Sequence, residues 1–250
     1  MMLDLHTHIL PHMDDGAGSG DEAAALIHAL MDQGITTAVL TPHYYPFKES
    51  LPAFLERRMW SYNSLGDCKL NLILGSETYL CESLFCYDSI SELAIESTEF
   101  LLLELPYTEP WSSDLFKQLR RIRSKYNLTP VIAHAERYGH VRQKRESILQ
   151  ELVDLGCMIQ LNIDSVIDRQ SRSLALSMLK GGWVDFVGSD CHNMKERPPR
   201  FDLFRRILAR KLHADVMNGS WPWTVNAWDA FSCEPRTRKE PISMETEARV

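Results

Sequence analysis

Residues 3–16 read LDLHTHILPHMDDG, a stretch that sets three histidines and three aspartates around a short apolar run. Charged and imidazole groups are costly in an apolar core unless they have partners, so their crowding here indicates a functional site. His6 and His8 are two residues apart, and side chains at this spacing along an extended strand point to the same side. Both imidazoles are therefore expected to face one metal ion.

Six further apolar runs follow, separated by stretches with helical patterning. All seven runs are too short for helices and many are β-branched, as expected of strands buried on both faces. The runs are MLDL (2–5), TAVLT (37–41), NLILG (71–75), FLLLE (100–104), PVIA (130–133), MIQLN (158–162) and VDFVG (184–188). Helices are predicted over residues 19–33, 112–126 and 142–155. This alternation predicts an α/β fold of parallel βαβ units, and seven units favour a closed or nearly closed barrel.

Acidic and imidazole residues lie at or just beyond the carboxyl ends of six of these seven strands. In a parallel barrel the carboxyl ends meet on one face. The candidate ligands are His6, His8, Asp14, Asp15, His43, Glu77, Glu104, His134, Asp190 and His192. So many acidic and imidazole groups in one place would repel or desolvate one another unless cations held them. Nitrogen and carboxylate donors without thiolate favour Mn²⁺, Fe²⁺ or Zn²⁺ in a catalytic site.

Composition narrows the class of protein. A chain of 250 residues with 44% hydrophobic residues can bury a sizeable core as one domain. The formal net charge of −7 argues against a nucleic-acid partner. No apolar run approaches the roughly 18 residues of a membrane span, so no membrane insertion is expected. A cytoplasmic location is expected because the first residues, MMLDLHTH, show no secretory signal, and the six cysteines are expected to be reduced thiols.

The ordered motifs DLHTHILPHMDDG, TPHYYP, GSETY, LLLELP, VIAHAERY, GCMIQLN and GSDCHNMKERPP resemble those of the PHP (polymerase and histidinol phosphatase) superfamily. Within it, they resemble the bacterial metal-dependent tyrosine-protein phosphatases of capsule and exopolysaccharide loci. The resemblance extends over residues 2–212. It implies a distorted seven-stranded (β/α)7 barrel of the TIM-like, PHP type. The PHP domain is expected over residues 1–233, and the polar, mixed-charge composition of residues 234–250 predicts a flexible tail.

The resemblance also implies a cluster of three divalent ions, usually Mn²⁺, with Fe²⁺ or Zn²⁺ as alternatives. The implied ligands are His6, His8, Glu77 and Asp190 for one ion, Glu77 with Glu104 and His134 nearby for a second, and Asp15, His43 and His192 for the third. Asp15 is preferred to Asp14 because it directly precedes the glycine of D-D-G. Arg137 and Arg197 would grip phosphate oxygens, since a planar guanidinium can hold two of them.

The implied activity is hydrolysis of phosphotyrosine by metal-activated water, that is, a phosphoric monoester hydrolase. The leaving phenol has a pKa near 10, so it needs less protonation than an alkyl alcohol. The implied partner is a tyrosine-phosphorylated protein, namely an autophosphorylated bacterial tyrosine kinase that controls capsule or exopolysaccharide synthesis. The aromatic stretch YYPFKESLPAFLERRMW (44–60) is predicted to overhang the site, with Tyr44, Tyr45 and Phe47 contacting the substrate.

Other functions remain open at this point. Cys191 and Arg197 satisfy the C-x5-R spacing of cysteine-dependent phosphatases, but the interval lacks glycine and Pro198 follows it at once. Strand alternation also turns Cys191 away from the side shared by Asp190 and His192. A small-molecule phosphatase of the histidinol-phosphate kind, a phosphodiesterase or nuclease, and a metal-bound scaffold without turnover would use the same ligands.

Overall fold

The computed structural model describes residues 2–107 and 111–212. Within these ranges the strands are β1 (Leu3–Thr7), β2 (Thr37–Leu40), β3 (His43–Tyr44), β4 (Asn71–Leu74), β5 (Glu77–Tyr79), β6 (Phe100–Glu104), β7 (Thr129–Ile132), β8 (Met158–Asn162) and β9 (Phe186–Gly188). The α-helices are α1 (Gly20–Asp32), α2 (Leu51–Asn63), α3 (Ser113–Tyr126), α4 (Gly139–Asp154), α5 (Asp164–Ile167), α6 (Arg172–Lys180) and α7 (Phe201–Leu212). Each of the seven predicted runs is a strand, and the three predicted helices are present.

The two strands that the sequence did not predict, β3 and β5, continue β2 and β4 beyond a bend. β2 pairs with β4, and after the bend His43 pairs with Glu77. The first halves belong to a sheet of order β1-β2-β4 and the second halves to a sheet of order β3-β5-β6-β7-β8-β9. All the strand pairs are parallel. The segment formed by β2 and β3 therefore passes from the first sheet to the second, and so does the segment formed by β4 and β5.

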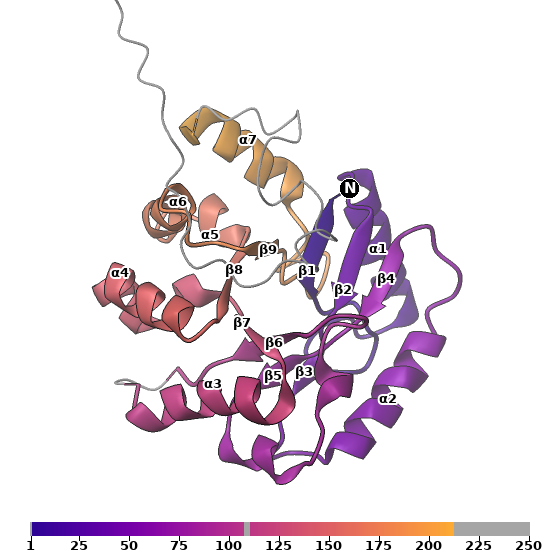
Figure 1. Cartoon of the computed structure of the whole chain (residues 1–250). Helices are drawn as coiled ribbons and strands as arrows, with labels where there is room; N and C mark the ends of the chain where they lie inside the picture. Colours follow the sequence, from indigo (N-terminus) through magenta and orange to yellow (C-terminus); the bar gives the residue numbers. More distant parts are fainter. Residues whose placement is uncertain (1, 108–110, 213–250) are drawn as a thin grey trace, which may run out of the picture.

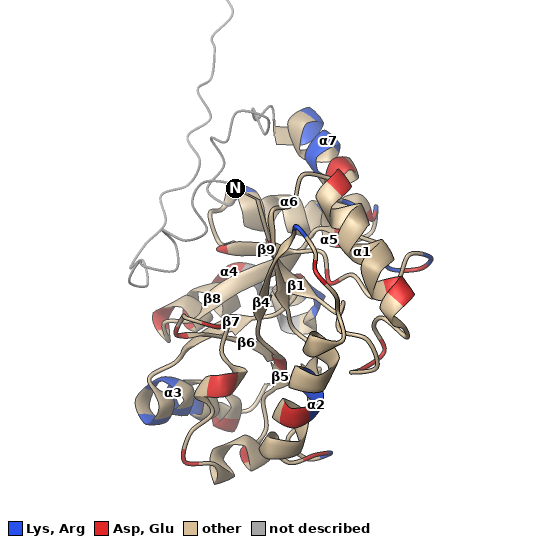
Figure 2. Cartoon of the chain, turned by 90° about the vertical axis from the view of Figure 1, so that its right-hand side faces the viewer, with Lys and Arg blue, Asp and Glu red and all other residues tan. Residues whose placement is uncertain are grey.

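The last strand returns to the first. A β-bridge joins Thr7 to Cys191, the Asp190 N–H donates to the His6 carbonyl at 2.7 Å, and the His8 N–H donates to the Cys191 carbonyl at 2.9 Å. Figures 1 and 2 show the resulting curled sheet, with the helices around its outside. The predicted α/β fold with a distorted parallel barrel is confirmed.

Two apolar clusters hold the helices and strands together. The outer cluster packs helix side chains, such as Leu26 and Phe204, against the outer face of the sheet. The inner cluster fills the barrel toward the amino ends of the strands. It consists of Leu3, Leu5, Val39, Ile73, Ile95, Phe100, Leu102, Val131, Ala133, Met158 and Phe186. Burial of each large apolar side chain contributes about 1.5–3 kcal/mol. The inner cluster leaves the carboxyl ends of the strands free for polar side chains.

The helix ends follow the signals in the sequence. The Ser19 hydroxyl accepts a hydrogen bond from the Glu22 N–H at 3.2 Å and caps α1. Gly34 and Gly156 lie just past α1 and α4 with φ of 78° and 77°, a left-handed conformation that favours glycine. The sequence thus encodes where these helices begin and end.

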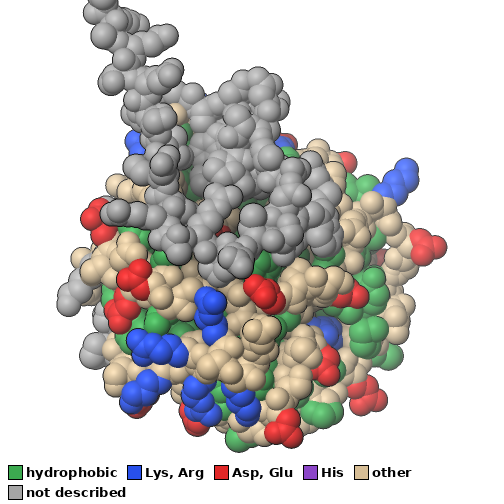
Figure 3. All heavy atoms as spheres, in the orientation of Figure 1, with side chains coloured by type: hydrophobic (Ala, Val, Ile, Leu, Met, Phe, Trp, Pro, Cys, Tyr) green, Lys and Arg blue, Asp and Glu red, His purple; other side chains and the backbone are tan. Residues whose placement is uncertain are grey.

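Across residues 2–107 and 111–212, no helix is both long and apolar enough to cross a membrane. On the face drawn in Figure 3, lysine and arginine side chains lie among aspartate and glutamate side chains. The predicted domain end at residue 233 and the predicted tail over residues 234–250 lie outside the described residues and stay predictions.

Candidate metal centre

The inner face of the barrel changes from apolar to polar toward the carboxyl ends of the strands. Along four strands and the residues that follow them, an inner-cluster residue and a candidate ligand are separated by an even number of positions. The pairs are Val39 and His43, Ile73 and Glu77, Leu102 and Glu104, and Phe186 and Asp190. Within β6 the alternation of the strand carries Glu104 into the site. His43 and Glu77 follow a bend, and Asp190 lies past the end of β9 with a φ of 54°, yet these three also reach the ligand groups above the inner cluster.

β1 reaches the same site by a different route. Leu3 and Leu5 belong to the inner cluster, so unbroken alternation would turn His6 and His8 outward. Instead, the register of β1 on β2 shifts between Asp4 and Thr7, and such a bulge re-aims the side chains that follow it. The prediction that His6 and His8 face the same site is confirmed, but the bulge is what brings them there.

The buried Asp4 carboxylate stabilises this irregular backbone. Asp4 Oδ1 accepts hydrogen bonds from the Ser189 N–H at 2.8 Å and from the His6 N–H at 3.3 Å. Asp4 Oδ2 accepts from the Ser189 hydroxyl at 2.5 Å. Burial raises the pKa of Asp4 to about 6. Asp4 is thus a supporting residue that the search for metal ligands did not single out.

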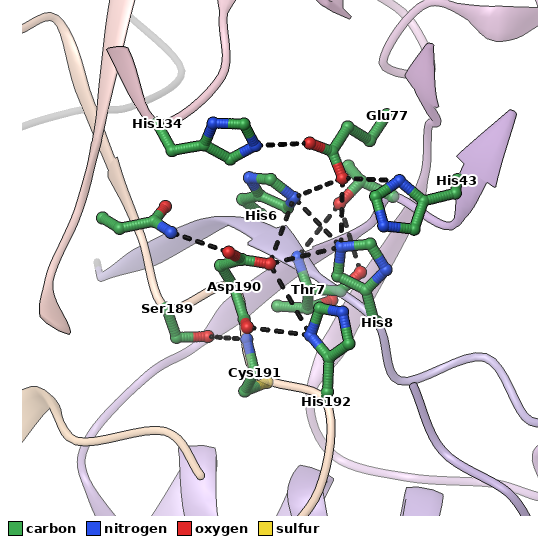
Figure 4. Close-up of polar contacts among 12 residues, drawn as sticks. His6, Thr7, His8, His43, Glu77, His134, Ser189, Asp190, Cys191 and His192 are labelled. Carbon is green, nitrogen blue, oxygen red and sulfur yellow. Dashed lines mark hydrogen bonds and ion pairs between the residues drawn. The ribbon is translucent and has the colours of Figure 1, made fainter. Parts of the chain in front are cut away.

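Three overlapping groups of side chains have the spacing of metal ligands, as Figure 4 shows for most of their members. Within each group the potential ligand atoms lie within 4.8 Å of one another. The groups are His6, His8 and Asp190; His43, Glu77 and Glu104; and His8, Asp15, His43 and His192. Eight of the nine predicted ligands therefore converge in these groups, from segments at both ends of the described chain.

Glu77 lies at the centre of these groups and brings in the ninth predicted ligand. Its Oε2 is 3.1 Å from His6 Nε2 and 3.0 Å from His43 Nδ1. Its Oε1 is 2.7 Å from Nε2 of His134, which has a left-handed backbone with φ of 32°. Burial would raise the pKa of Glu77, but the electrostatic attraction of His6 and His43, with the hydrogen bonds from His134 and His6, outweighs it and lowers the pKa well below its usual value.

The carboxyl group of Glu104, in the same region, has its pKa shifted in the opposite direction. Burial, together with the negative charge of Glu77, raises the pKa of Glu104 to about 7. A carboxyl group that resists ionisation beside another carboxylate would ionise readily beside a divalent cation. The pair therefore suits a cation bound between them.

The two aspartates of the D-D-G motif have different surroundings. Asp14 is almost buried, and its Oδ2 accepts hydrogen bonds from His8 Nδ1 at 2.7 Å and from the His43 N–H at 2.8 Å. The Asp15 side chain is 69% exposed, and its Oδ1 lies 3.4 Å from His192 Nε2. The geometry favours Asp15 as the ligand and Asp14 as the carboxylate that orients His8, as carboxylates commonly do for metal-binding histidines.

The two predicted arginines meet on one carboxylate oxygen. Asp190 Oδ2 lies 2.9 Å from Arg137 Nη1 and 2.6 Å from Arg197 Nη2. Asp190 Oδ1 faces the imidazoles instead, at 3.4 Å from His8 Nε2. Both arginine side chains are about one-third exposed, at 35% and 34%. Asp190 thus contacts the imidazoles through one oxygen and, through the other, two guanidinium groups that solvent can reach.

The donor set fits divalent metal ions. His192 Nδ1 lies 2.9 Å from the Asp190 carbonyl oxygen, which can only accept, so Nδ1 carries the proton and Nε2 is left as the ligand atom. Among the described residues, buried His192 Nε2 makes no hydrogen bond of good geometry, and the Asp15 Oδ1 atom that lies 3.4 Å from it can only accept. A buried ring nitrogen without a partner is costly, and a metal ion would satisfy it. Imidazole and carboxylate donors together suit Mn²⁺, Fe²⁺ or Zn²⁺.

Comparison with known proteins agrees with this geometry. Residues 2–220 match the family described as capsular polysaccharide synthesis, CpsB/CapC. The chain belongs to the CpsB/CapC family. It is similar to the tyrosine-protein phosphatase YwqE of Bacillus subtilis (strain 168), with 29% identity over 212 residues, 78% of this chain and 79% of YwqE. It is also similar to the tyrosine-protein phosphatase CpsB of Streptococcus agalactiae serotype III (strain NEM316), with 27% identity over 230 residues, 87% of this chain and 93% of that protein.

A solved structure is similar to this CpsB/CapC chain along most of its length. It belongs to the crystal structures of "YwqE from Bacillus subtilis and CpsB from Streptococcus pneumoniae, unique metal-dependent tyrosine phosphatases". The TM-score is 0.72 at 27% identity, over 86% of this chain and 89% of that chain. The predicted resemblance to the capsule-locus branch of the PHP superfamily is confirmed.

The Cys191 side chain of this CpsB/CapC chain packs in the apolar core. Its side chain is fully buried in the outer apolar cluster, and burial raises the pKa of its thiol well above the usual value. A nucleophilic cysteine needs the opposite, a lowered pKa and access to substrate. All five cysteines among the described residues are free thiols.

Replacing Cys191 with serine is therefore expected to leave kcat for a phosphotyrosyl substrate close to the wild-type value. The cost should fall on stability, because the substitution buries a hydroxyl among apolar groups. Steady-state kinetics and thermal unfolding on the same preparation measure both effects. Complete loss of kcat in a folded Cys191→Ser protein would restore the thiolate mechanism.

The structure bears on the predicted aromatic contacts at one residue, and the contacts of Tyr45 and Phe47 with substrate stay predictions. Tyr44 is fully buried and packs on Phe54, with ring centroids 4.8 Å apart, so its prediction as a substrate contact is wrong. His43 faces the site, and strand alternation turns the next side chain away from it. Tyr45 stacks on His43 at 5.2 Å instead. Tyr79, which the sequence did not single out, lies 5.9 Å from Tyr45.

Proposed function

We propose that this chain is a metal-dependent protein-tyrosine phosphatase that hydrolyses phosphotyrosine with water. The observation that carries the proposal is the set of three overlapping imidazole and carboxylate groups flanked by two arginines. The relatives named as tyrosine-protein phosphatases support the reaction class. The similar solved structure, described as a metal-dependent tyrosine phosphatase, supports the need for metal.

The proposed cofactor is three divalent ions, with Mn²⁺ as the first choice and Fe²⁺ or Zn²⁺ as alternatives. His6, His8 and Asp190 would hold one ion, Glu77 and Glu104 a second with His134 beside it, and Asp15, His43 and His192 the third. When bound, such ions activate water and neutralise charge on the phosphoryl group. Glu77 and Asp190 supply the negative charge that holds the ions, because both are buried with pKa values below the usual range.

Arg137 and Arg197 are proposed to bind the phosphoryl oxygens. Both side chains lie at the rim, partly exposed, and Asp190 holds them side by side. A phosphomonoester is a dianion, and two planar guanidinium groups can offer it paired hydrogen bonds. Their role is to bind and orient the phosphate next to the ligand groups.

The aromatic wall, defined here as Tyr45, Phe47 and Tyr79, is proposed to bind the phenyl ring of the substrate. Tyr45 and Phe47 have ring centroids 5.7 Å apart, and Phe47 and Tyr79 are 5.6 Å apart. The Phe47 side chain is 58% exposed. Since Tyr45 stacks on His43, the wall begins at the ligand groups and extends to solvent.

Removing rings from this wall is expected to weaken binding of phosphotyrosine. Aromatic pairs contribute about 0.5–1.5 kcal/mol, so Phe47→Ala and Tyr79→Leu should each raise KM for a phosphotyrosyl peptide roughly two- to tenfold. The KM for the matching phosphoseryl peptide should not rise. Trp60→Ala serves as the control, because it removes an exposed ring from α2. Equal KM changes for both peptides would contradict a role in ring recognition.

The proposed physiological substrate is an autophosphorylated bacterial tyrosine kinase that controls capsule or exopolysaccharide synthesis. The family description, capsular polysaccharide synthesis, supports this setting. A half-exposed ring such as Phe47 suits a tyrosine presented on a peptide segment. Dephosphorylation of the purified kinase by this chain, followed with a phosphotyrosine antibody, tests this part of the proposal.

A substrate panel tests the proposed reaction. The full chain is treated with chelator, reloaded with Mn²⁺, and assayed on a phosphotyrosyl peptide, histidinol phosphate and single-stranded DNA. The phosphotyrosyl peptide is expected to give the highest kcat/KM, and the chelated protein no turnover. A preference for histidinol phosphate or DNA would favour the small-molecule phosphatase or the nuclease, and turnover of none of them would favour a scaffold.

A further inference from the structure

β8 offers neither histidine nor carboxylate to the site, but it does supply two buried amides. Gln160 and Asn162 are fully buried, two residues apart. They continue the side of β8 that begins with Met158 of the inner cluster. Buried amides persist only where their hydrogen bonds are satisfied, and here their partners are the candidate metal ligands.

The two amides form a directed chain of hydrogen bonds. The His134 N–H donates to Gln160 Oε1 at 2.6 Å, Gln160 Nε2 donates to Asn162 Oδ1 at 2.9 Å, and Asn162 Nδ2 donates to Asp190 Oδ2 at 2.7 Å. A backbone N–H can only donate and a carboxylate can only accept. Both ends therefore fix which way the amides point, and the chain has one direction.

The side-chain oxygen of Gln160 also favours one tautomer of His6. Gln160 Oε1 lies 3.4 Å from His6 Nδ1, and because this oxygen can only accept, the geometry favours a proton on Nδ1. His6 Nε2 then faces the site, 3.1 Å from Glu77 Oε2 and 3.6 Å from Asp190 Oδ1. Gln160 thus presents the nitrogen that a metal ion would need.

The chain also ties down strained backbone. His134 and Asp190 have φ values of 32° and 54°, a region that costs energy for residues other than glycine and persists where the surroundings impose it. Gln160 accepts a hydrogen bond from the His134 N–H, and Asn162 donates one to the Asp190 carboxylate. Gly188 leaves room for this arrangement, since an added Cβ would lie 2.5 Å from His6 Cβ and 3.0 Å from Gln160 Nε2.

We propose that Gln160 and Asn162 are positioning residues that align His6, His134 and Asp190 for metal binding. The inference rests on the proposed metal-dependent function, and it assigns a role to the strand that carries no ligand. Partners of this kind typically change metal affinity about 10- to 100-fold when they are removed.

The test compares Gln160→Met with Gln33→Met in the full chain. Gln33 also bridges two segments through its amide, donating to the Ala29 and Pro199 carbonyls at 2.9 and 2.8 Å, but these partners lie outside the ligand groups. Mn²⁺ is titrated into chelator-treated protein and free Mn²⁺ is followed by electron paramagnetic resonance. Gln160→Met is expected to weaken Mn²⁺ binding about 10- to 100-fold, and Gln33→Met to leave it unchanged.

A second readout uses the metal-free protein. Ring ¹⁵N chemical shifts of His6 are expected to show the proton on Nδ1 in the wild type and in Gln160→Glu, which keeps the acceptor oxygen. They should show that preference lost in Gln160→Met. Wild-type Mn²⁺ affinity and unchanged His6 shifts in Gln160→Met would overturn the inference. A wild-type chain that binds no Mn²⁺, with His6 shifts that still depend on Gln160, would instead overturn the proposed metal centre.

Discussion

Asp190→Asn is expected to remove nearly all hydrolysis of phosphotyrosyl peptide. Asp190 Oδ1 faces the imidazoles of His6 and His8, and Oδ2 accepts from Arg137 and Arg197. An amide of the same shape has no charge to hold a cation and places an NH₂ group against one of these partners. Metal assistance contributes several kcal/mol and each 1.4 kcal/mol is tenfold, so kcat should fall at least about 10³-fold.

Asp185→Asn is the matched control for this substitution. Asp185 lies at the opposite end of β9, where its carboxylate accepts from the Ile159 N–H at 2.9 Å. It should keep kcat and metal content close to wild type. Steady-state kinetics, metal analysis and thermal unfolding of both variants separate loss of the site from loss of the fold. A folded Asp190→Asn protein with wild-type kcat would contradict the assigned site.

Gly16→Ala is expected to disable the site from outside the ligand groups. A Cβ at Gly16 would lie 2.2 Å from the His8 carbonyl oxygen, 2.6 Å from His8 Cβ and 2.9 Å from Asp14 Oδ1. The loop must therefore move away from His8, and Asp14 with it. We expect a loss of about 1–3 kcal/mol in the free energy of unfolding, and roughly 10²-fold in kcat because misplacement by about 1 Å is that costly.

Gly18→Ala controls for flexibility in the same loop. A Cβ there would meet only Glu22 Oε2, at 3.6 Å, which is an ordinary contact. Gly18→Ala should retain wild-type stability and kcat, as measured by chemical denaturation and steady-state kinetics. If both substitutions had the same small effect, the close approach beneath His8 would not be what holds the site together.

Much of this architecture was predictable because short apolar runs have few alternatives. Runs such as FLLLE (100–104) are too short for helices and end in a ligand, and the period of two carries the ligand to the interior. Residues such as Glu104 and Asp190 could therefore be assigned to one end of a barrel from the sequence alone. Parallel strands then brought them together.

Features that depend on neighbours in space were not predictable. The bulge in β1 shows only in its register against β2, and the bends before β3 and β5 only in the exchange of partners between two sheets. Glu77 lies at the start of β5 because the chain bends after β4. Nothing in the sequence of one strand fixes which residue of its neighbour it will face.

Other residues were missed although the sequence held a signal. Two amides at positions i and i+2 in a strand buried on both faces, as in MIQLN (158–162), imply polar partners inside the barrel. Alternation from His43 indicates that Tyr45, and not Tyr44, shares its side. Asp14 was a candidate ligand, but its role in orienting His8 carried no such signal, because that role depends on the distance from His8 Nδ1.

The central claim is that distant parts of the chain form one site for divalent cations. Metal analysis of the full chain, purified without added ions, tests it most directly when the same measurement is made on a His6→Ala, His43→Ala double variant. We predict more than one divalent ion per wild-type chain and loss of most of this metal in the double variant, with the fold retained. A wild-type chain without stoichiometric metal, or a double variant with undiminished metal, would contradict the claim.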